Sequence, residues 1–227
     1  MLSEERPYEK CERFGAGSLT DIELLAVLLR TGTKGESALD LARKLFYPGE
    51  GTQPQAKAHL QSWTKEELLK ISGIGRVKAI QILCLCDLSK RMSQLSARED
   101  LDFSRPDTIA AYYMEDMRYY RQEHLKLLML NTRSRLIGES EISRGTVNMS
   151  VISPRELFIE ALQKNAVYII LLHNHPSGDP MPSREDILVT QRIREGGSLL
   201  GIELLDHIII GDNCYVSLAE QKLLKEK

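Results

Sequence analysis

The spacing of apolar residues changes along the chain and divides it into a helical part and a mixed part. Up to about residue 92, apolar residues recur every three or four positions, which predicts helices. From about residue 125, short apolar runs of strand length alternate with helical stretches. The polar segment 93–104 lies between the two patterns. We therefore expect an all-helical domain at residues 1–100 and a mixed domain at residues 103–227.

Helix-start signals and turn residues give the elements of the helical part. In a capping box, a Ser or Thr and an acidic residue three positions later satisfy each other's backbone N–H groups, and the pairs Thr20/Glu23 and Thr64/Glu67 fit this pattern. The expected elements are a helix over 22–29 ended by Gly32, a helix over 37–46, a polar connection at 47–62, a short helix after Thr64 and a longer helix over 76–92.

The mixed part predicts helices and strands around one sheet. The expected elements are a helix at 107–118, strands at 125–130 and 135–142, a helix over 154–165 capped by Ser153 and Glu156, a strand at 167–172, a helix over 184–195 ended by Gly196 and Gly197, and strands at 202–210 and 214–217. The sheet should carry antiparallel hairpins at both ends. The fold class is therefore an α+β or α/β sandwich.

Composition narrows the class of protein. The 227 residues are 42% hydrophobic and 27% charged with a net charge of −2, which is typical of a soluble globular protein. We expect a cytoplasmic protein without a membrane segment, because the start lacks an apolar signal core and no run approaches the ~18 apolar residues of a membrane span. The four cysteines form no Cys-x-x-Cys pair, which argues against a zinc knuckle and a disulfide framework.

Two histidines follow an apolar run of strand length, and a loop rich in Pro and Gly comes after them. Side chains two apart on a strand point the same way, so His173 and His175 would present two imidazoles to one point while Asn174 faces the other side. Ser183 is a good N-cap, and Asp186, at the third helical position, would face back toward the histidines. Two imidazoles and one carboxylate leave one tetrahedral position of a zinc ion open, as in catalytic zinc sites.

A plainer interpretation of the same residues stays open. Ser183 and Asp186 alone form a Ser-x-x-Asp capping box, which needs no metal. His173 and His175 alone fit ordinary polar residues at a sheet edge. The combination of the histidine pair on a strand, a loop of fixed length and the helix start favours the metal site.

The pattern His173-x-His175, seven residues, Ser183, two residues, Asp186 resembles the JAMM (MPN-plus) motif of zinc metalloproteases. The run His-Asn-His-Pro-Ser-Gly-Asp-Pro, together with Leu-Asp-His-Ile-Ile-Ile-Gly at 205–211, resembles the bacterial RadC family in particular. The N-terminal segments that also resemble that family are 18–25, 29–35 and 73–75. The resemblance implies the JAMM/MPN fold, which is related to the cytidine-deaminase-like fold, and Zn²⁺ as cofactor.

The resemblance also implies catalytic roles. A zinc-bound water, its pKa lowered toward ~7, would be the nucleophile. The general base of JAMM enzymes is a glutamate before the first strand of the domain, which matches Glu123. Ser183 would donate to the developing oxyanion. His207 would either orient a ligand from behind or be an ordinary structural histidine. The glutamates that compete with Glu123 are Glu139, Glu141 and Glu156.

An apolar-Gly-apolar-Gly turn between two helices of the helical part predicts a helix-hairpin-helix. Gly73 and Gly75 would let backbone N–H groups approach a phosphate, with Arg76 and Lys78 beside it, so non-specific DNA is a possible partner. Against this, residues 1–100 carry 15 Lys and Arg against 14 Asp and Glu, which gives no strong basic field. Packing or protein contact is the alternative role of this turn.

Three classes of function remain. The first is a zinc-dependent hydrolase, a metallopeptidase or isopeptidase, which the JAMM resemblance favours. The second is a DNA-repair-associated factor that binds DNA through the helix-hairpin-helix or processes it, in the latter case with the metal site as a nuclease. The third is a non-catalytic interaction module with a protein partner, and the complete ligand set argues against it. A zinc deaminase is excluded, because the Pro-Cys-x-x-Cys and His-x-Glu signatures are missing.

Overall fold

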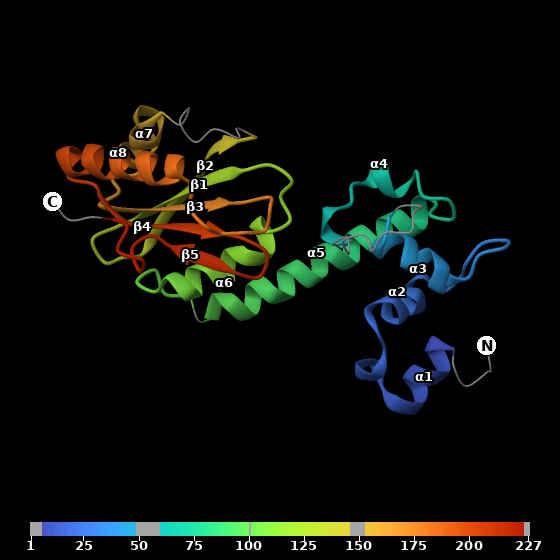
Figure 1. Cartoon of the computed structure of the whole chain (residues 1–227). Coiled ribbons are helices and arrows are strands. Elements are labelled where there is room, and N and C mark those ends of the chain that lie inside the picture. Colours follow the sequence, from blue (N-terminus) through green and yellow to red (C-terminus); the bar gives the residue numbers. More distant parts are fainter. Residues whose placement is uncertain (1–5, 49–59, 100, 146–152, 225–227) are drawn as a thin grey trace. The chain divides into compact units, whose positions relative to one another are not determined.

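The computed structural model describes residues 6–48, 60–99, 101–145 and 153–224. The chain forms two compact units, residues 1–89 and 90–227, and each has its own hydrophobic core (Figure 1). Most of the polar connection expected at 47–62 lies outside the described residues. The domain bounds 1–100 and 103–227 stay a prediction. Among the described helices, none has the length and apolar character needed to cross a membrane.

The N-terminal unit is helical, as the apolar spacing predicts. Its elements are α1 (Pro7–Phe14), the 3-10 helix η2 (Ala16–Ser18), α2 (Asp21–Leu29), α3 (Ala38–Phe46), the 3-10 helix η3 (Leu60–Ser62), α4 (Lys65–Leu68) and the start of α5 (Arg76–Glu99). The capping boxes expected at Thr20 and Thr64 both form, and Ser37 makes a third with Asp40. Buried side chains such as Leu41, Leu45 and Leu68 make up its core.

The helix α5 is longer than the sequence pattern predicts. It continues to Glu99 instead of ending near Met92. The polar residues from 93 to 99 contain neither Gly nor Pro, and good helix formers are among them, so polarity alone does not end the helix. Within the second unit, Lys90 of α5 forms an ion pair with Asp116.

The C-terminal unit is a mixed sheet between two layers of helices, which confirms the expected fold class. Its elements after α5 are α6 (Pro106–Met117), β1 (His124–Leu130), β2 (Leu136–Arg144), α7 (Pro154–Gln163), β3 (Tyr168–Asn174), α8 (Arg184–Leu200), β4 (Glu203–Ile210) and β5 (Tyr215–Ser217). The strand order is β2-β1-β3-β4-β5. Among the described strands, only β3 and β4 pair in parallel, and the antiparallel hairpins β1–β2 and β4–β5 lie at the two ends, as expected.

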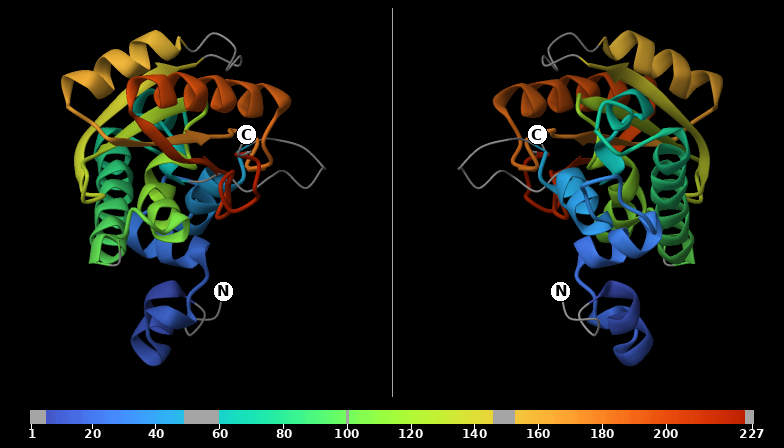
Figure 2. Two further views of the ribbon diagram at one scale, coloured as in Figure 1. Left: turned by 90° about the vertical axis from the view of Figure 1, so that its left-hand side faces the viewer. Right: turned by 90° about the vertical axis from the view of Figure 1, so that its right-hand side faces the viewer.

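The two faces of the sheet pack against different helices. Helices α7 and α8 cover one face and α6 covers the other, which Figure 1 and Figure 2 show from three sides. Successive side chains of a strand alternate between the faces. In β3, Ile169 and Leu171 therefore pack with α7 and α8, whereas Ile170 and Leu172 pack with α6. This alternation places His173 on the α8 face and Asn174 on the α6 face.

Two local predictions in this unit are wrong. Helix α8 does not end at Gly196 and Gly197 but runs to Leu200, where Gly201 ends it in the left-handed conformation with φ of +70°. Glycine inside a helix costs only ~1 kcal/mol relative to Ala, and here it permits a close approach described below. The capping box expected at Ser153 does not form, since its side chain makes no cap hydrogen bond.

We predict that Gly197→Ala destabilises the C-terminal unit by about 1–3 kcal/mol, because an added Cβ would overpack the end of α8. That atom would lie 2.2 Å from the carbonyl oxygen of Ile202. Thermal unfolding measures the change. The matched control is Ser198→Ala, at the next, exposed position, where we expect a change within about 0.5 kcal/mol. Equal melting temperatures for the two variants would contradict the packing described here.

Candidate metal centre

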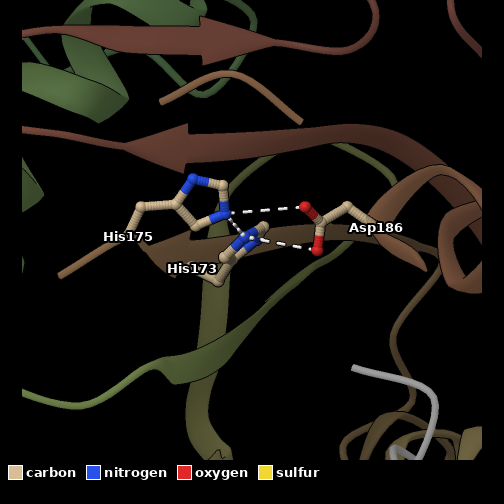
Figure 3. A group of neighbouring side chains, drawn as sticks. All are labelled: His173, His175 and Asp186. Carbon is tan, nitrogen blue, oxygen red and sulfur yellow. Dashed lines mark hydrogen bonds and ion pairs between the residues drawn. The ribbon is translucent and has the colours of Figure 1, made fainter. Parts of the chain in front are cut away.

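The side chains of His173 and His175 point to one place at the carboxyl end of β3 (Figure 3). His173 is fully buried, and the side chain of His175 is 14% exposed. Their Nε2 atoms lie 2.9 Å apart. The alternation of side chains along the strand predicted this arrangement.

The loop after His175 is bonded to the turn that follows β4. The N–H of Asp212 donates to the carbonyl of Gly178 at 2.9 Å. A Cβ at Gly211 would lie 2.3 Å from that carbonyl oxygen, so only glycine fits there. The loop brings the carbonyl of Asp179 to 2.7 Å from Nδ1 of His175. Because a carbonyl only accepts, Nδ1 carries the proton, and the Nε2 of a neutral His175 ring presents its lone pair.

The two carboxylate oxygens of Asp186 have different surroundings. Oδ2 accepts from both the backbone N–H and the hydroxyl of Ser183 at 2.7 Å each, and the N–H of Asp186 donates to the Ser183 hydroxyl at 3.1 Å. The capping box therefore forms. Oδ1 lies 3.5 Å from Nε2 of His173, and Oδ2 lies 3.5 Å from Nε2 of His175. The capping interpretation and the metal interpretation are thus compatible in one residue.

Burial and neighbouring charges set the protonation of this group. Burial, and next the nearby His207, lower the pKa of His173 well below its usual range. Contact with Asp186 raises the pKa of His175. Although burial opposes it, contact with His175 and the two hydrogen bonds from Ser183 hold the pKa of Asp186 well below its ordinary value. At neutral pH, Asp186 is a carboxylate and His173 a neutral imidazole, which are the forms that bind metal ions.

The donor set fits a metal ion. One ligand atom from each of His173, His175 and Asp186 lies within 4.8 Å of the others. Oδ1 of Asp186 is buried and has no hydrogen-bond partner among the described residues, and leaving such an atom unpaired costs about 1–3 kcal/mol. Imidazole and carboxylate ligands suit first-row transition metals. These three residues can therefore hold a metal ion, and together they are called the metal group.

Glu123 lies directly before β1, near the group. Strand β1 pairs with β3, and Leu125 is opposite His173 in the register. Burial raises the pKa of the Glu123 carboxyl, and His175 and Asp186 are the charged groups that act on it next. A carboxyl of raised pKa beside three candidate metal ligands is a candidate general base.

The competing glutamates have other surroundings. Glu139 accepts from the hydroxyl of Tyr113 on α6 at 2.8 Å. The carboxylate of Glu141 lies 2.9 Å from Nδ1 of His124. Glu156 is exposed in the first turn of α7. Glu123, in contrast to these contacts, has His175 and Asp186 among the groups that act on its carboxyl.

Asn174 is a positioning residue whose contacts the sequence did not predict. On the α6 face, its Oδ1 accepts from the N–H of His124 at 2.9 Å, and its Nδ2 donates to the carbonyls of Tyr120 and Gln122 at 3.4 and 3.1 Å. The residue between the two histidines therefore holds the segment that carries Glu123. The only signal in the sequence was its expected position on the opposite face of the strand.

His207 and Thr190 also lie behind the group. Nε2 of His207 is 2.7 Å from Nδ1 of His173, and Nδ1 of His207 is 2.6 Å from the hydroxyl of Thr190. The contact of His207 with His173 supports the interpretation that His207 orients His173 from behind. Thr190 carries no sequence signal, because a threonine inside a helix usually has a local role.

The residues expected to contact DNA lie in the N-terminal unit. Gly73 has φ of +91°, a backbone conformation that favours glycine, and a Cβ there would also lie 2.6 Å from Cδ2 of Leu41. The ammonium of Lys78 donates to the carbonyl of Thr31 at 2.6 Å and lies near two further carbonyls. Gly75 and Arg76 lie at the start of α5. Lys78 is thus engaged within the unit, and DNA contact by this turn stays a prediction.

Two family models match the chain. The model described as RadC-like JAB domain matches residues 103–223, and the model described as UPF0758 N-terminal matches residues 1–80. A UPF0758 protein of Bacillus licheniformis is 49% identical over 221 residues, which cover 97% of this chain and 96% of that protein. UPF0758 proteins of Clostridium botulinum and Clostridium tetani are 48% and 45% identical over 217 and 220 residues, or 96% and 97% of this chain and 93% and 94% of theirs. These names state no activity.

We predict that Asn174→Leu releases the segment that carries Glu123. The variant loses three hydrogen bonds of about 1 kcal/mol each, so amide exchange should accelerate at residues 120–124. Mass spectrometry of deuterium uptake measures this. The matched control is Asn131→Ala, which removes hydrogen bonds to Arg133 and Arg135 in the turn at the other end of β1. Unchanged exchange at 120–124 in Asn174→Leu would show that Asn174 does not hold the segment.

Proposed function

The chain belongs to the RadC-like JAB domain family, and from that premise we propose that it is a zinc-dependent hydrolase of the JAMM type that cleaves a peptide or isopeptide bond. One observation carries the proposal. His173, His175 and Asp186 converge at the end of β3, and the buried Oδ1 of Asp186 has no hydrogen-bond partner among the described residues. Such a donor set is typical of catalytic zinc sites.

In this proposal, the ligands are Nε2 of His173, Nε2 of His175 and the Asp186 carboxylate. Zinc bound there would act as a Lewis acid and lower the pKa of a water molecule toward ~7. Hydrogen bonds in the protein keep the ligands oriented before any metal binds. Nδ1 of His175 donates to the carbonyl of Asp179, and the backbone N–H of Ser183 donates to Asp186.

Glu123 is the proposed general base. Its carboxylate would take the proton from the attacking water and return it to the nitrogen of the leaving amine. Burial raises the pKa of Glu123, which brings the carboxyl closer to the pH at which such an exchange works best. Asn174 keeps the segment before β1 in place for this step.

Ser183 is the proposed donor to the oxyanion. Its hydroxyl hydrogen bonds to Oδ2 of Asp186, so it must rotate to reach a developing oxyanion. The backbone N–H of Ser183 donates to the same oxygen at 2.7 Å. That second bond would hold Asp186 in place while the hydroxyl turns.

The other two functions are less well supported. A DNA-processing role would need the glycine turn to bind phosphate, but the ammonium of Lys78 is occupied by backbone carbonyls. A non-catalytic interaction module would not need the complete set of His173, His175 and Asp186. The non-catalytic module also does not account for the unpaired oxygen of Asp186.

We predict that protein purified without chelators contains about one zinc ion per chain and that His175→Ala contains almost none, because the ligand set then falls to two. Elemental analysis by mass spectrometry measures the content. His124→Gln is the matched control, since His124 contacts Glu141 rather than the metal group, and it should retain zinc. Equal zinc in wild type and His175→Ala would rule out this site.

We predict that Glu123→Gln keeps its zinc and lowers hydrolysis of peptide and isopeptide libraries by about 10²–10⁴-fold, because the amide cannot accept the proton. Glu156→Gln, at an exposed position in α7, serves as the control and should retain activity. Zinc content, measured on the same samples, separates loss of the base from loss of the site. A Glu123→Gln variant as active as wild type would remove Glu123 from this role.

A further inference from the structure

A chain of three hydrogen bonds joins the rear of His173 to the backbone of Asp186. Nδ1 of His173 lies 2.7 Å from Nε2 of His207, and Nδ1 of His207 lies 2.6 Å from Oγ1 of Thr190. The Thr190 hydroxyl lies 2.5 Å from the carbonyl oxygen of Asp186. His173 and His207 are completely buried and Thr190 is 1% exposed, so water does not compete for these bonds.

The last acceptor, the carbonyl oxygen of Asp186, determines which atom donates in each of the three hydrogen bonds. The carbonyl of Asp186 can only accept, so the hydroxyl of Thr190 must donate to it. The oxygen of Thr190 is then the acceptor for His207, whose Nδ1 carries the proton. The opposite direction would leave two oxygen atoms 2.5 Å apart with no proton between them, which is repulsive.

The position of the proton on His207 determines the position of the proton on His173. His207 is completely buried, and its two ring nitrogens face the Thr190 hydroxyl and the imidazole of His173. A neutral imidazole has only one N–H to share between these two partners. Since that proton is on Nδ1, Nε2 of His207 accepts. His173 must then donate from Nδ1, which leaves its own Nε2 without a proton.

We propose that Thr190 and His207 are positioning residues that fix the tautomer of His173, so that the lone pair of Nε2 faces the metal group. The use of this tautomer for metal binding rests on the proposed function, but the tautomer itself exists in the metal-free protein. These hydrogen bonds join three elements, because His173 is on β3, His207 on β4, and Thr190 and Asp186 are both on α8. Two ligands of the group, His173 and Asp186, are thereby connected from behind.

His175, the other proposed histidine ligand, is also protonated at Nδ1, but through a different hydrogen bond. Nδ1 of His175 donates to the carbonyl of Asp179 in the loop. The two Nε2 atoms, 2.9 Å apart, then both present lone pairs when the rings are neutral. Only a cation, either a proton or a metal ion, can relieve that repulsion. Groups bonded to the far nitrogen of a metal-binding histidine commonly change metal affinity by about 10–100-fold.

The test compares Thr190→Val, which keeps the shape and removes the hydroxyl, with Thr190→Ser, which keeps the hydroxyl. Zinc affinity is measured by competition with a chromophoric chelator, using zinc ions alone as the probe. We expect binding about 10–100-fold weaker in Thr190→Val and within about threefold of wild type in Thr190→Ser. Equal affinity in Thr190→Val and wild type would overturn the proposal.

A second measurement needs no variant that has to fold. Long-range ¹H–¹⁵N NMR of the metal-free wild-type chain identifies the protonated nitrogen of each imidazole. We expect His173 and His207 to be protonated at Nδ1 only, and a proton on Nε2 of His173 would overturn the proposal. If the wild type binds no zinc, the proposed function fails, whereas the tautomers still decide whether Thr190 and His207 orient His173.

Discussion

The rest of the metal group depends on the different surroundings of the two carboxylate oxygens of Asp186. Oδ2 closes the capping box at the start of α8, and Oδ1 is left buried without a hydrogen-bond partner among the described residues. The cap fixes where the helix begins, and the beginning of the helix fixes where the carboxylate lies. The stabilising helix cap and the proposed metal ligand are therefore the same side chain, and losing the cap would also displace the carboxylate.

The central strand β3 gives the group its second constraint. Its alternating side chains send His173 toward α8 and Asn174 toward the segment before β1. One face of the strand thus supplies a ligand, while the other face orients the segment with the proposed base, Glu123. The antiparallel pairing of β1 with β3 brings these two ends together. Because both strands are buried, each position is determined by packing as well as by hydrogen bonds.

Local sequence patterns were sufficient for most features that depend on a few neighbouring residues, although the capping box expected at Ser153 does not form. The capping boxes at Thr20, Thr64 and Ser183, the convergence of His173 and His175, and the antiparallel hairpins at both ends of the sheet all follow from short-range spacing. The contacts of Asn174 with Tyr120, of Thr190 with His207 and of Lys78 with Thr31 join residues 17 to 54 positions apart. Such contacts depend on the tertiary fold, so no local pattern could predict them. For the same reason, Gly197 looked like a helix end, although its missing Cβ makes room for the carbonyl of Ile202, which lies just after α8.

The central claim is that the ligand atoms of His173, His175 and Asp186 bind one zinc ion. A crystal structure recorded on both sides of the zinc absorption edge tests it most directly, because the anomalous signal locates zinc without reference to activity. We expect one peak among the three side chains, with zinc at ~2.0–2.1 Å from both Nε2 atoms and ~2.0–2.2 Å from a carboxylate oxygen of Asp186. A crystal grown with zinc that shows no peak there, or a peak at other ligands such as Cys214, would contradict it.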